Sequence, residues 1–236
     1  MIATDTVSLL ARTRLFGMVP AETLTRVAEQ AQLRSCRKGE VIVHQGDSAE
    51  TLFVVVEGLV KVFVTSPEGA EMVLVTLGPT DTFGELAVVD GGERSASAEA
   101  CELTTLLVLR RSALLALLPD HPDLIEGLLR SLGALARRLT DQTADLVFLD
   151  LHGRVAKLLL GLAEERGEVR DGMRVLDLHL TQSDLASMVG GSRQSVNQIL
   201  RTFETLGYLE VEGRRMLVLR PDLLRRRAGL PEVSPT

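Results

Sequence analysis

Aromatic residues and cysteine are scarce in this chain of 236 residues. Tryptophan is absent, tyrosine occurs once, and the two cysteines, Cys36 and Cys101, lie far apart. Such a pair provides no disulfide framework, no CxxC motif and no spacing for an iron–sulfur cluster. The sequence therefore predicts a protein of a reducing compartment, the cytoplasm, without a cluster of this kind.

Long apolar runs are missing as well. No stretch of about 18 apolar residues is free of charge, and the first residues, MIATDTVSLLARTRLF, lack a charged start followed by a long apolar core. We therefore expect neither a membrane span nor a secretion signal. The four histidines show no arrangement suited to haem or to a metal ion, so neither is expected as a cofactor.

Basic residues are outnumbered, because 26 Lys and Arg against 32 Asp and Glu give a net charge of −6. Taken alone, this balance argues against a nucleic-acid partner. The charge is uneven, however, with 13 basic and 11 acidic residues from residue 152 onward, and 13 against 21 before it. DNA binding needs only a local basic face, so the C-terminal part stays a candidate for it.

The segment from Pro122 to Asp150 has no internal proline and predicts one helix, much longer than the ~11–12 residues of an average globular helix. Its apolar residues recur at alternating steps of four and three, which is typical of a helix that pairs with a copy of itself. Gln142 is the polar position of this heptad seam and is expected to fix its register. A buried amphipathic helix within one domain is the alternative. The expected dimer contacts are Leu128, Leu132, Leu135, Leu139, Gln142 and Leu146, with Leu149 continuing the seam.

The block that precedes this helix is rich in short β-branched runs. Residues 1–34 read as short helices, but from Arg37 onward runs such as TLFVVVEGLVKVFV alternate with glycine-containing turns. Short strands with turns at regular spacing predict a small β-barrel or jelly roll. The segment SPEGAE predicts a tight hairpin turn between two of the strands.

One stretch breaks the strand rhythm, namely FGELAVVDGGERSAS, which starts at Phe83. Gly84 followed by ELAVV predicts a turn that opens a very short helix, whose first N–H groups can face an anion. A guanidinium and a hydroxyl beside it would suit one phosphate, and Glu85 could accept a hydrogen bond from a sugar hydroxyl. Alternatively, Arg94 and Glu85 pair with each other or face water. The candidate ligand-binding residues here are Gly84, Glu85, Leu86, Arg94 and Ser95.

The segment from Thr181 to Tyr208 predicts two helices joined by Gly190-Gly191. Thr181 suits an N-cap with Asp184 three residues on, and Ser192 suits the cap of the second helix. One face of that second helix is apolar, whereas the other carries side chains that can reach base edges or phosphates. This is a helix-turn-helix arrangement, and LEVEGRRMLVLR predicts a wing after it. A solvated polar face on an ordinary helix hairpin is the alternative. The candidate DNA-binding residues are Ser192, Arg193, Gln194, Asn197, Gln198, Arg201, Arg214 and Arg215.

Taken together, the order of these parts resembles the Crp–Fnr family of bacterial transcription regulators. The resemblance rests on FGELAVVDGGERSA, on ADLVFLDLHGRVAKLLL and on LTQSDLASMVGGSRQSVNQIL, in that order. It implies a homodimer, a β-roll that receives a cyclic nucleotide such as cyclic AMP, and a C-terminal winged helix for DNA. It also implies that Gly84 and Glu85 hold the ribose, and that Arg94 with Ser95 holds the cyclic phosphate.

The resemblance has departures as well. Family members that bind a nucleotide contact its base through two adjacent polar residues of the long helix. Counted back from FLD these are Leu139 and Thr140, the first of which is apolar; counted forward from ARRL they are Gln142 and Thr143. We prefer the first count because ADLVFLD is the longer match. In the reading helix, Gln194 and Gln198 stand where the family pattern has a glutamate and an arginine.

The sequence thus predicts an α+β protein in three parts: an effector β-roll at 1–119, a dimerisation helix at 120–150 and a winged helix-turn-helix at 151–236. We expect a homodimeric, sequence-specific transcription regulator, controlled by a small effector, that binds an inverted-repeat DNA site and meets RNA polymerase. One alternative is a constitutive regulator with a purely structural roll, which Leu139 favours and Arg94 opposes. An enzyme of the cupin type would need a cluster of histidines and carboxylates, and only His44 lies in the strand-rich block.

Overall fold

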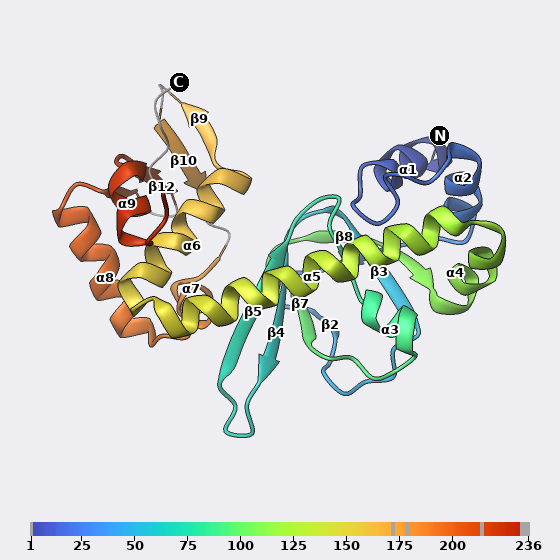
Figure 1. Cartoon of the computed structure of the whole chain (residues 1–236), viewed down its shortest axis with the longest axis horizontal. Coiled ribbons are helices and arrows are strands. Elements are labelled where there is room, and N and C mark those ends of the chain that lie inside the picture. Colours follow the sequence, from blue (N-terminus) through green and yellow to red (C-terminus); the bar gives the residue numbers. More distant parts are fainter. Residues whose placement is uncertain (1, 171–172, 178–179, 213–214, 232–236) are drawn as a thin grey trace. The chain divides into compact units, whose positions relative to one another are not determined.

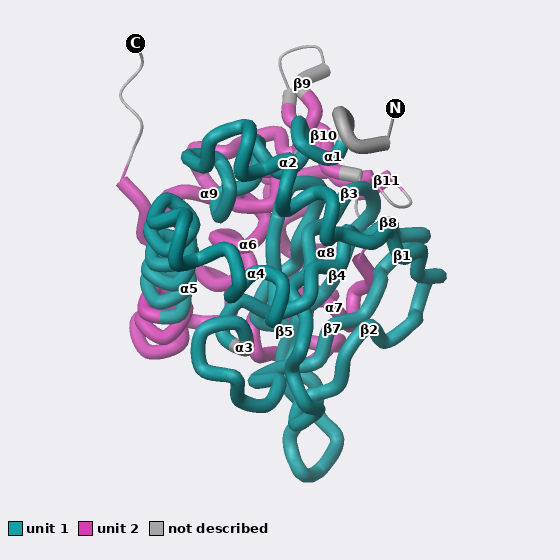
Figure 2. The backbone as a smooth tube through the Cα atoms, turned by 90° about the vertical axis from the view of Figure 1, so that its right-hand side faces the viewer, with its two compact units in different colours: residues 1–139 teal, residues 140–236 magenta. Residues whose placement is uncertain are grey.

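The protein was analysed as a computed structural model, which describes residues 2–170, 173–177, 180–212 and 215–231. The chain forms two compact units, residues 1–139 and 140–236 (Figure 2). The boundary between the two units falls inside the long helix. In the division predicted from the sequence, this helix, residues 120–150, is instead a separate part. That three-part division stays a prediction.

Two antiparallel four-stranded sheets make the strand-rich part of the first unit (Figure 1). Their orders are β1-β8-β3-β6 and β2-β7-β4-β5. The side chains between them form an apolar core that includes Phe53, Val55 and Leu106. The expected β-roll is therefore confirmed. Its strands are β1 Gln32–Cys36, β2 Val41–Val43, β3 Thr51–Glu57, β4 Val60–Thr65, β5 Glu71–Leu77, β6 Thr82–Phe83, β7 Ser97–Ala100 and β8 Thr104–Arg110.

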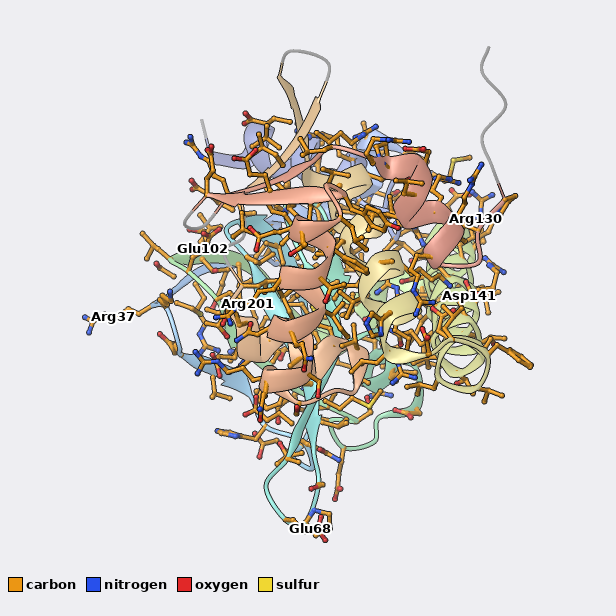
Figure 3. The ribbon with its side chains drawn as sticks, turned by 90° about the vertical axis from the view of Figure 1, so that its left-hand side faces the viewer. Arg37, Glu68, Glu102, Arg130, Asp141 and Arg201 are labelled. Carbon is orange, nitrogen blue, oxygen red and sulfur yellow. The ribbon has the colours of Figure 1, made fainter. Side chains whose placement is uncertain are left out.

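Two of these strands have weak local signals. β1 begins at Gln32, inside the region expected to be helical, and β7 has the sequence SAEA, which lacks β-branched residues. Pairing decides both cases, because β1 aligns along β8, and β7 lies between β2 and β4. The expected SPEGAE turn is confirmed, since the Gly69 N–H donates to the Ser66 carbonyl at 2.9 Å between β4 and β5. Glu68 marks the tip of this hairpin (Figure 3).

A second core in the same unit lies between the roll and its helices. Buried residues such as Leu10, Phe16 and Leu24 meet Leu107 of β8 and Leu124 of the long helix there. Gly127 of that helix faces the backbone of Leu15 so closely that a Cβ would lie 1.9 Å from the Leu15 carbonyl oxygen. The helices of this unit are α1 Ile2–Ala11, α2 Ala21–Glu29, α3 Glu85–Asp90 and α4 Arg111–Leu117, followed by the 3₁₀ turn η1 Leu118–Asp120.

The long helix α5 runs over Pro122–Phe148 and crosses from the first unit into the second. The expected end at Asp150 is wrong, because Asp150 is the N-cap of the next helix and its Oδ1 accepts from the Gly153 N–H at 2.8 Å. Leu149 therefore lies one residue beyond α5, and its N–H still donates to the Asp145 carbonyl at 3.0 Å.

In its described residues, the second unit combines four helices beyond α5 with a four-stranded sheet of order β11-β12-β10-β9. Phe203, Leu159 and Met216 lie in its core. In this sheet Glu168–Arg170 pairs antiparallel with residues 173–175. The elements are α6 Leu151–Arg166, β9 Glu168–Arg170, β10 Met173–Asp177, α7 Gln182–Val189, α8 Arg193–Thr205, β11 Leu209–Glu212, β12 Arg215–Val218 and α9 Pro221–Arg227.

The expected helix-turn-helix signals are confirmed in this unit. Thr181 and Asp184 form a full capping box at the start of α7, and Ser192 caps α8 by accepting from the Ser195 N–H. Gly190 ends α7 with a φ of +63°, a left-handed conformation that favours glycine. The wing is the β11–β12 hairpin.

The contact at Gly127 gives a stability prediction. Gly127→Ala should lower the free energy of unfolding by at least about 2 kcal/mol, because the new methyl group meets a backbone oxygen that cannot turn away. Gly161→Ala in α6 is the matched control: its Cβ would meet nothing within 4 Å. That change should raise the free energy of unfolding by about 0.5–1 kcal/mol through helix propensity. Urea unfolding measures both, and equal stability of the two variants would contradict the packing described.

Candidate functional site

Arg94 is a buried cation with unused donors. Its side chain is 7% exposed. Nη2 donates to the carbonyl oxygen and to the hydroxyl of Thr51, at 2.7 and 2.8 Å. Within the described part of the chain, the buried Nε and Nη1 have no hydrogen-bond partner. The N–H groups of these two nitrogens are therefore fixed in place and lack an acceptor, which an anion could supply.

The surroundings of Arg94 do not neutralise it. Its Cζ lies 5.4 Å from the ring centre of Phe53, and no described carboxylate forms an ion pair with it. Burial lowers the pKa of Arg94, and the charge of Asp47 opposes this only in part. A buried charge without a counterion is costly, and a bound anion with two oxygens would offset that cost through paired hydrogen bonds.

Gly84 allows the close approach that builds this site. Its φ is +90°, and a Cβ at this position would lie 2.5 Å from Arg94 Nη1 and 2.9 Å from the Thr51 carbonyl oxygen. Any side chain would therefore strain the backbone and displace the guanidinium. The turn at Gly84 and the position of Arg94 depend on each other.

Glu85, the first residue of α3, does not pair with Arg94. Its Oε1 instead accepts a hydrogen bond from the Ser131 hydroxyl of α5 at 3.1 Å. Burial raises the pKa of Glu85, while hydrogen bonds from its own backbone and from Ser131, and the charge of Arg138, act in the opposite direction. The alternative in which Glu85 and Arg94 neutralise each other is not what the structure shows.

The remaining ligand candidates are more open. Leu86 and Ser95 are exposed, and Leu139 and Thr140 are exposed positions of α5. The structure thus brings Gly84, Glu85 and Arg94 together; the ligand roles of all these residues stay predictions.

Sequence reasoning missed three residues of this site, namely Thr51, Phe53 and Ser131. Ser131 had a signal, because it is a hydroxyl in the buried series Leu124, Gly127 and Leu128 of α5. Thr51 and Phe53 had none, because they lie on an ordinary β-branched strand, and only the fold brings them to Arg94.

The outer face of α8 carries the candidate DNA-reading residues on one surface. Arg193, Gln194, Gln198 and Arg201 are exposed there, and Asn197 is half-buried. Figure 3 shows the Arg201 side chain on this helix. The opposite face holds Val196, Ile199, Leu200 and Phe203 in the core, which confirms the predicted division of the helix into two faces. Ser192 acts as the N-cap, so its hydroxyl is already engaged.

The wing offers less positive charge than expected. Arg215 is exposed, but in the strand register it lies opposite Glu212 of β11 and Asp177 of β10. Arg214 lies outside the described residues.

Two arginines of α9 form ion pairs within the second unit. Arg225 pairs with Glu164 at 3.0 Å, and Arg227 pairs with Asp150 at 2.6 Å. The pKa of Asp150 is lowered mainly by the hydrogen bond from Arg227.

Two other features are absent from the described residues. No group of three or more His, Cys, Asp or Glu there could hold a metal ion, and His44 is exposed. None of the helices described is both long and apolar enough to cross a membrane.

Known proteins match both units of this chain. Residues 33–121 match the cyclic nucleotide-binding domain, and residues 153–227 match the Crp-like helix-turn-helix domain. The chain is 35% identical to the CRP-like cAMP-activated global transcriptional regulator of Mycobacterium tuberculosis over 220 residues, 93% of this chain and 98% of that protein. It is 34% identical to the cAMP-activated global transcriptional regulator CRP of Salmonella typhimurium, over 75% of this chain and 84% of that protein.

A solved structure agrees in fold. FixK2 from Bradyrhizobium japonicum superposes with a TM-score of 0.76, covering 87% of this chain and 99% of that one at 24% identity. The relatives are transcription regulators, and the expectation that this chain is not an enzyme is confirmed on that ground. The chain belongs to the Crp family of transcription regulators, with a cyclic nucleotide-binding domain and a Crp-like helix-turn-helix domain.

Proposed function

We propose that this regulator is a homodimer whose affinity for a specific DNA site is set by a cyclic nucleotide bound in the β-roll, with cyclic AMP as the first candidate. The observation that carries the proposal is Arg94, which is buried beside Gly84 with two nitrogens, Nε and Nη1, that have no hydrogen-bond partner among the described residues. Two relatives are named as cAMP-activated, which supports the choice of effector.

In this proposal the cyclic phosphate accepts hydrogen bonds from Nε and Nη1 of Arg94, with the exposed hydroxyl of Ser95 beside it. The ribose lies at Gly84 and Glu85, and Leu86 borders it. The base reaches α5 at Leu139 and Thr140. Because Leu139 is apolar, only Thr140 offers a polar side chain to the base, where a pair of polar residues would offer two.

A copy of the chain is the proposed partner of α5, but the exposed stripe differs from the predicted seam. Leu128 is 5% exposed and lies in the core of its own unit, whereas Leu129 is 63% exposed. A heptad seam drawn along the exposed side of α5 still contains Leu132, Leu139 and Leu146. Each of the other seam positions moves one residue towards the C-terminus relative to the seam predicted from the sequence. The proposed seam is therefore Ile125, Leu129, Leu132, Ala136, Leu139, Thr143 and Leu146, with Thr143 in place of Gln142.

Two α8 helices related by twofold symmetry imply an inverted-repeat site with half-sites about one helical turn apart, ~34 Å. Arg193 can donate two hydrogen bonds to guanine, whereas Gln194 and Gln198 suit adenine and discriminate less firmly between bases.

RNA polymerase is a further proposed partner, as expected of a regulator that acts on transcription.

The effector site is tested by Arg94→Ala in calorimetric titration with cyclic AMP. Loss of charge-assisted hydrogen bonds worth roughly 1.5–3 kcal/mol should weaken binding about tenfold to a hundredfold or more. Arg37→Ala removes an exposed arginine of the same unit and should leave the affinity unchanged. Unchanged affinity in Arg94→Ala would refute the phosphate assignment, and no binding to the wild type would favour a constitutive regulator.

The seam is tested by comparing two substitutions in adjacent residues. Thr143→Leu should tighten the dimer several-fold, because a polar residue at a seam position costs stability, whereas Gln142→Leu should change it little. Sedimentation equilibrium measures both dissociation constants. Tightening by Gln142→Leu alone would restore the seam expected from the sequence.

DNA reading is tested by selection from random duplexes. Arg193→Ala should cost about 1–3 kcal/mol and lose the preference at one G·C pair per half-site, because only that pair loses its bidentate contact. Gln194→Glu should shift the preference at a neighbouring pair towards cytosine. Arg201→Ala, the control, should weaken all sequences alike and flatten the salt dependence. A recovered motif without twofold symmetry would contradict the proposal.

A further inference from the structure

Ser131 occupies a position on α5 where an apolar residue is expected. The buried face of this helix carries Leu124, Gly127 and Leu128, and Ser131 continues it one turn later with 6% of its surface exposed. Hydroxyls in buried helical positions usually bond to a carbonyl of the preceding turn. Here the hydroxyl donates across to Glu85 Oε1 at 3.1 Å instead. A buried polar group with a partner outside its own helix indicates a role beyond packing.

The partner of this hydroxyl is the carboxylate beside the anion site. Glu85 directly follows Gly84, whose missing side chain admits the Arg94 guanidinium. Without a second contact, the long Glu85 side chain could adopt several rotamers and would lose that freedom on binding a ligand. The Ser131 hydrogen bond supplies such a contact before any ligand is present.

The hydrogen bond leaves acceptor capacity on Glu85. A carboxylate has two oxygens and about four lone-pair directions, and Ser131 donates to Oε1. In a 3′,5′-cyclic nucleotide the O3′ and O5′ atoms are both part of the phosphate ester, so the 2′-hydroxyl is the free hydroxyl of the ribose. It needs one acceptor, and Glu85 can provide it while keeping Ser131.

We propose that Ser131 is a positioning residue, which fixes the Glu85 carboxylate for the 2′-hydroxyl of the effector's ribose, so that α5 takes part in selecting the effector. This inference rests on the proposed binding of a cyclic nucleotide in the β-roll. It assigns to α5 a role in the ribose half of the site, separate from any contact with the base. Burial raises the pKa of Glu85, and the hydrogen bond from Ser131 opposes this shift, as expected of a donor to a carboxylate.

The test compares cyclic AMP with 2′-deoxy cyclic AMP by calorimetric titration of the full chain. The wild type should prefer cyclic AMP. Ser131→Ala should weaken cyclic AMP binding roughly three- to tenfold, about the worth of one hydrogen bond, and leave the 2′-deoxy analogue unaffected. Ser131→Cys, close in size but a weak donor, should behave like Ser131→Ala. Ser112→Ala removes an exposed serine of α4 and should change neither affinity.

A double-mutant cycle with Glu85→Ala separates positioning from packing. If Ser131 acts through Glu85, Ser131→Ala should have no further effect on cyclic AMP binding in the Glu85→Ala background. A purely structural role would weaken both ligands equally and add to the loss in Glu85→Ala. Tighter cyclic AMP binding by Ser131→Ala would show competition with the ribose and overturn the inference, as would an unchanged preference between the two ligands. Failure of the wild type to bind either ligand would overturn the proposed function and this inference together.

Discussion

The burial of one arginine without a counterion is the constraint on which the first unit depends. Arg94 is anchored through a single nitrogen to Thr51, is flanked by the Phe53 ring, and approaches Gly84 where any side chain would collide. Such a site is unfavourable when empty, because a desolvated guanidinium keeps two donors unused. A ligand with a compact anionic group gains the hydrogen bonds that the fold leaves open, and this difference is the source of affinity that we assign to a cyclic phosphate.

Helix α5 connects this site to the other functions of the chain. On its buried face, Ser131 donates a hydrogen bond to Glu85. Its exposed stripe is the proposed surface for a second copy of the chain. Its last turns belong to the unit that carries α8. Ligand control of DNA binding requires only that the effector prefer one arrangement of paired helices over another. A single continuous helix that meets the ligand site and the proposed partner provides a physical route for that preference.

Much of this architecture could be predicted from local patterns. Thr181, Gly190 and Ser192 specify the helix-turn-helix through capping and a left-handed turn, both of which are short-range effects. Arg94 and Gly84 were found because they share one motif. The partners Thr51 and Ser131 were not, since they are 43 and 46 residues away from the groups they bind. The predicted seam included Leu128, which the structure buries in the core of its own unit, because a heptad pattern cannot tell such a face from one open to a partner.

We propose that effector binding in the β-roll and DNA binding through α8 are thermodynamically coupled. Fluorescence anisotropy of a labelled duplex, carrying the site recovered by selection, measures DNA affinity with and without saturating cyclic AMP at one fixed salt concentration. The account predicts tighter DNA binding with cyclic AMP, and a matching gain in cyclic AMP affinity when the duplex is present, because coupling between two sites is reciprocal. Equal DNA affinity with and without the nucleotide, in a protein that binds it, would contradict the account.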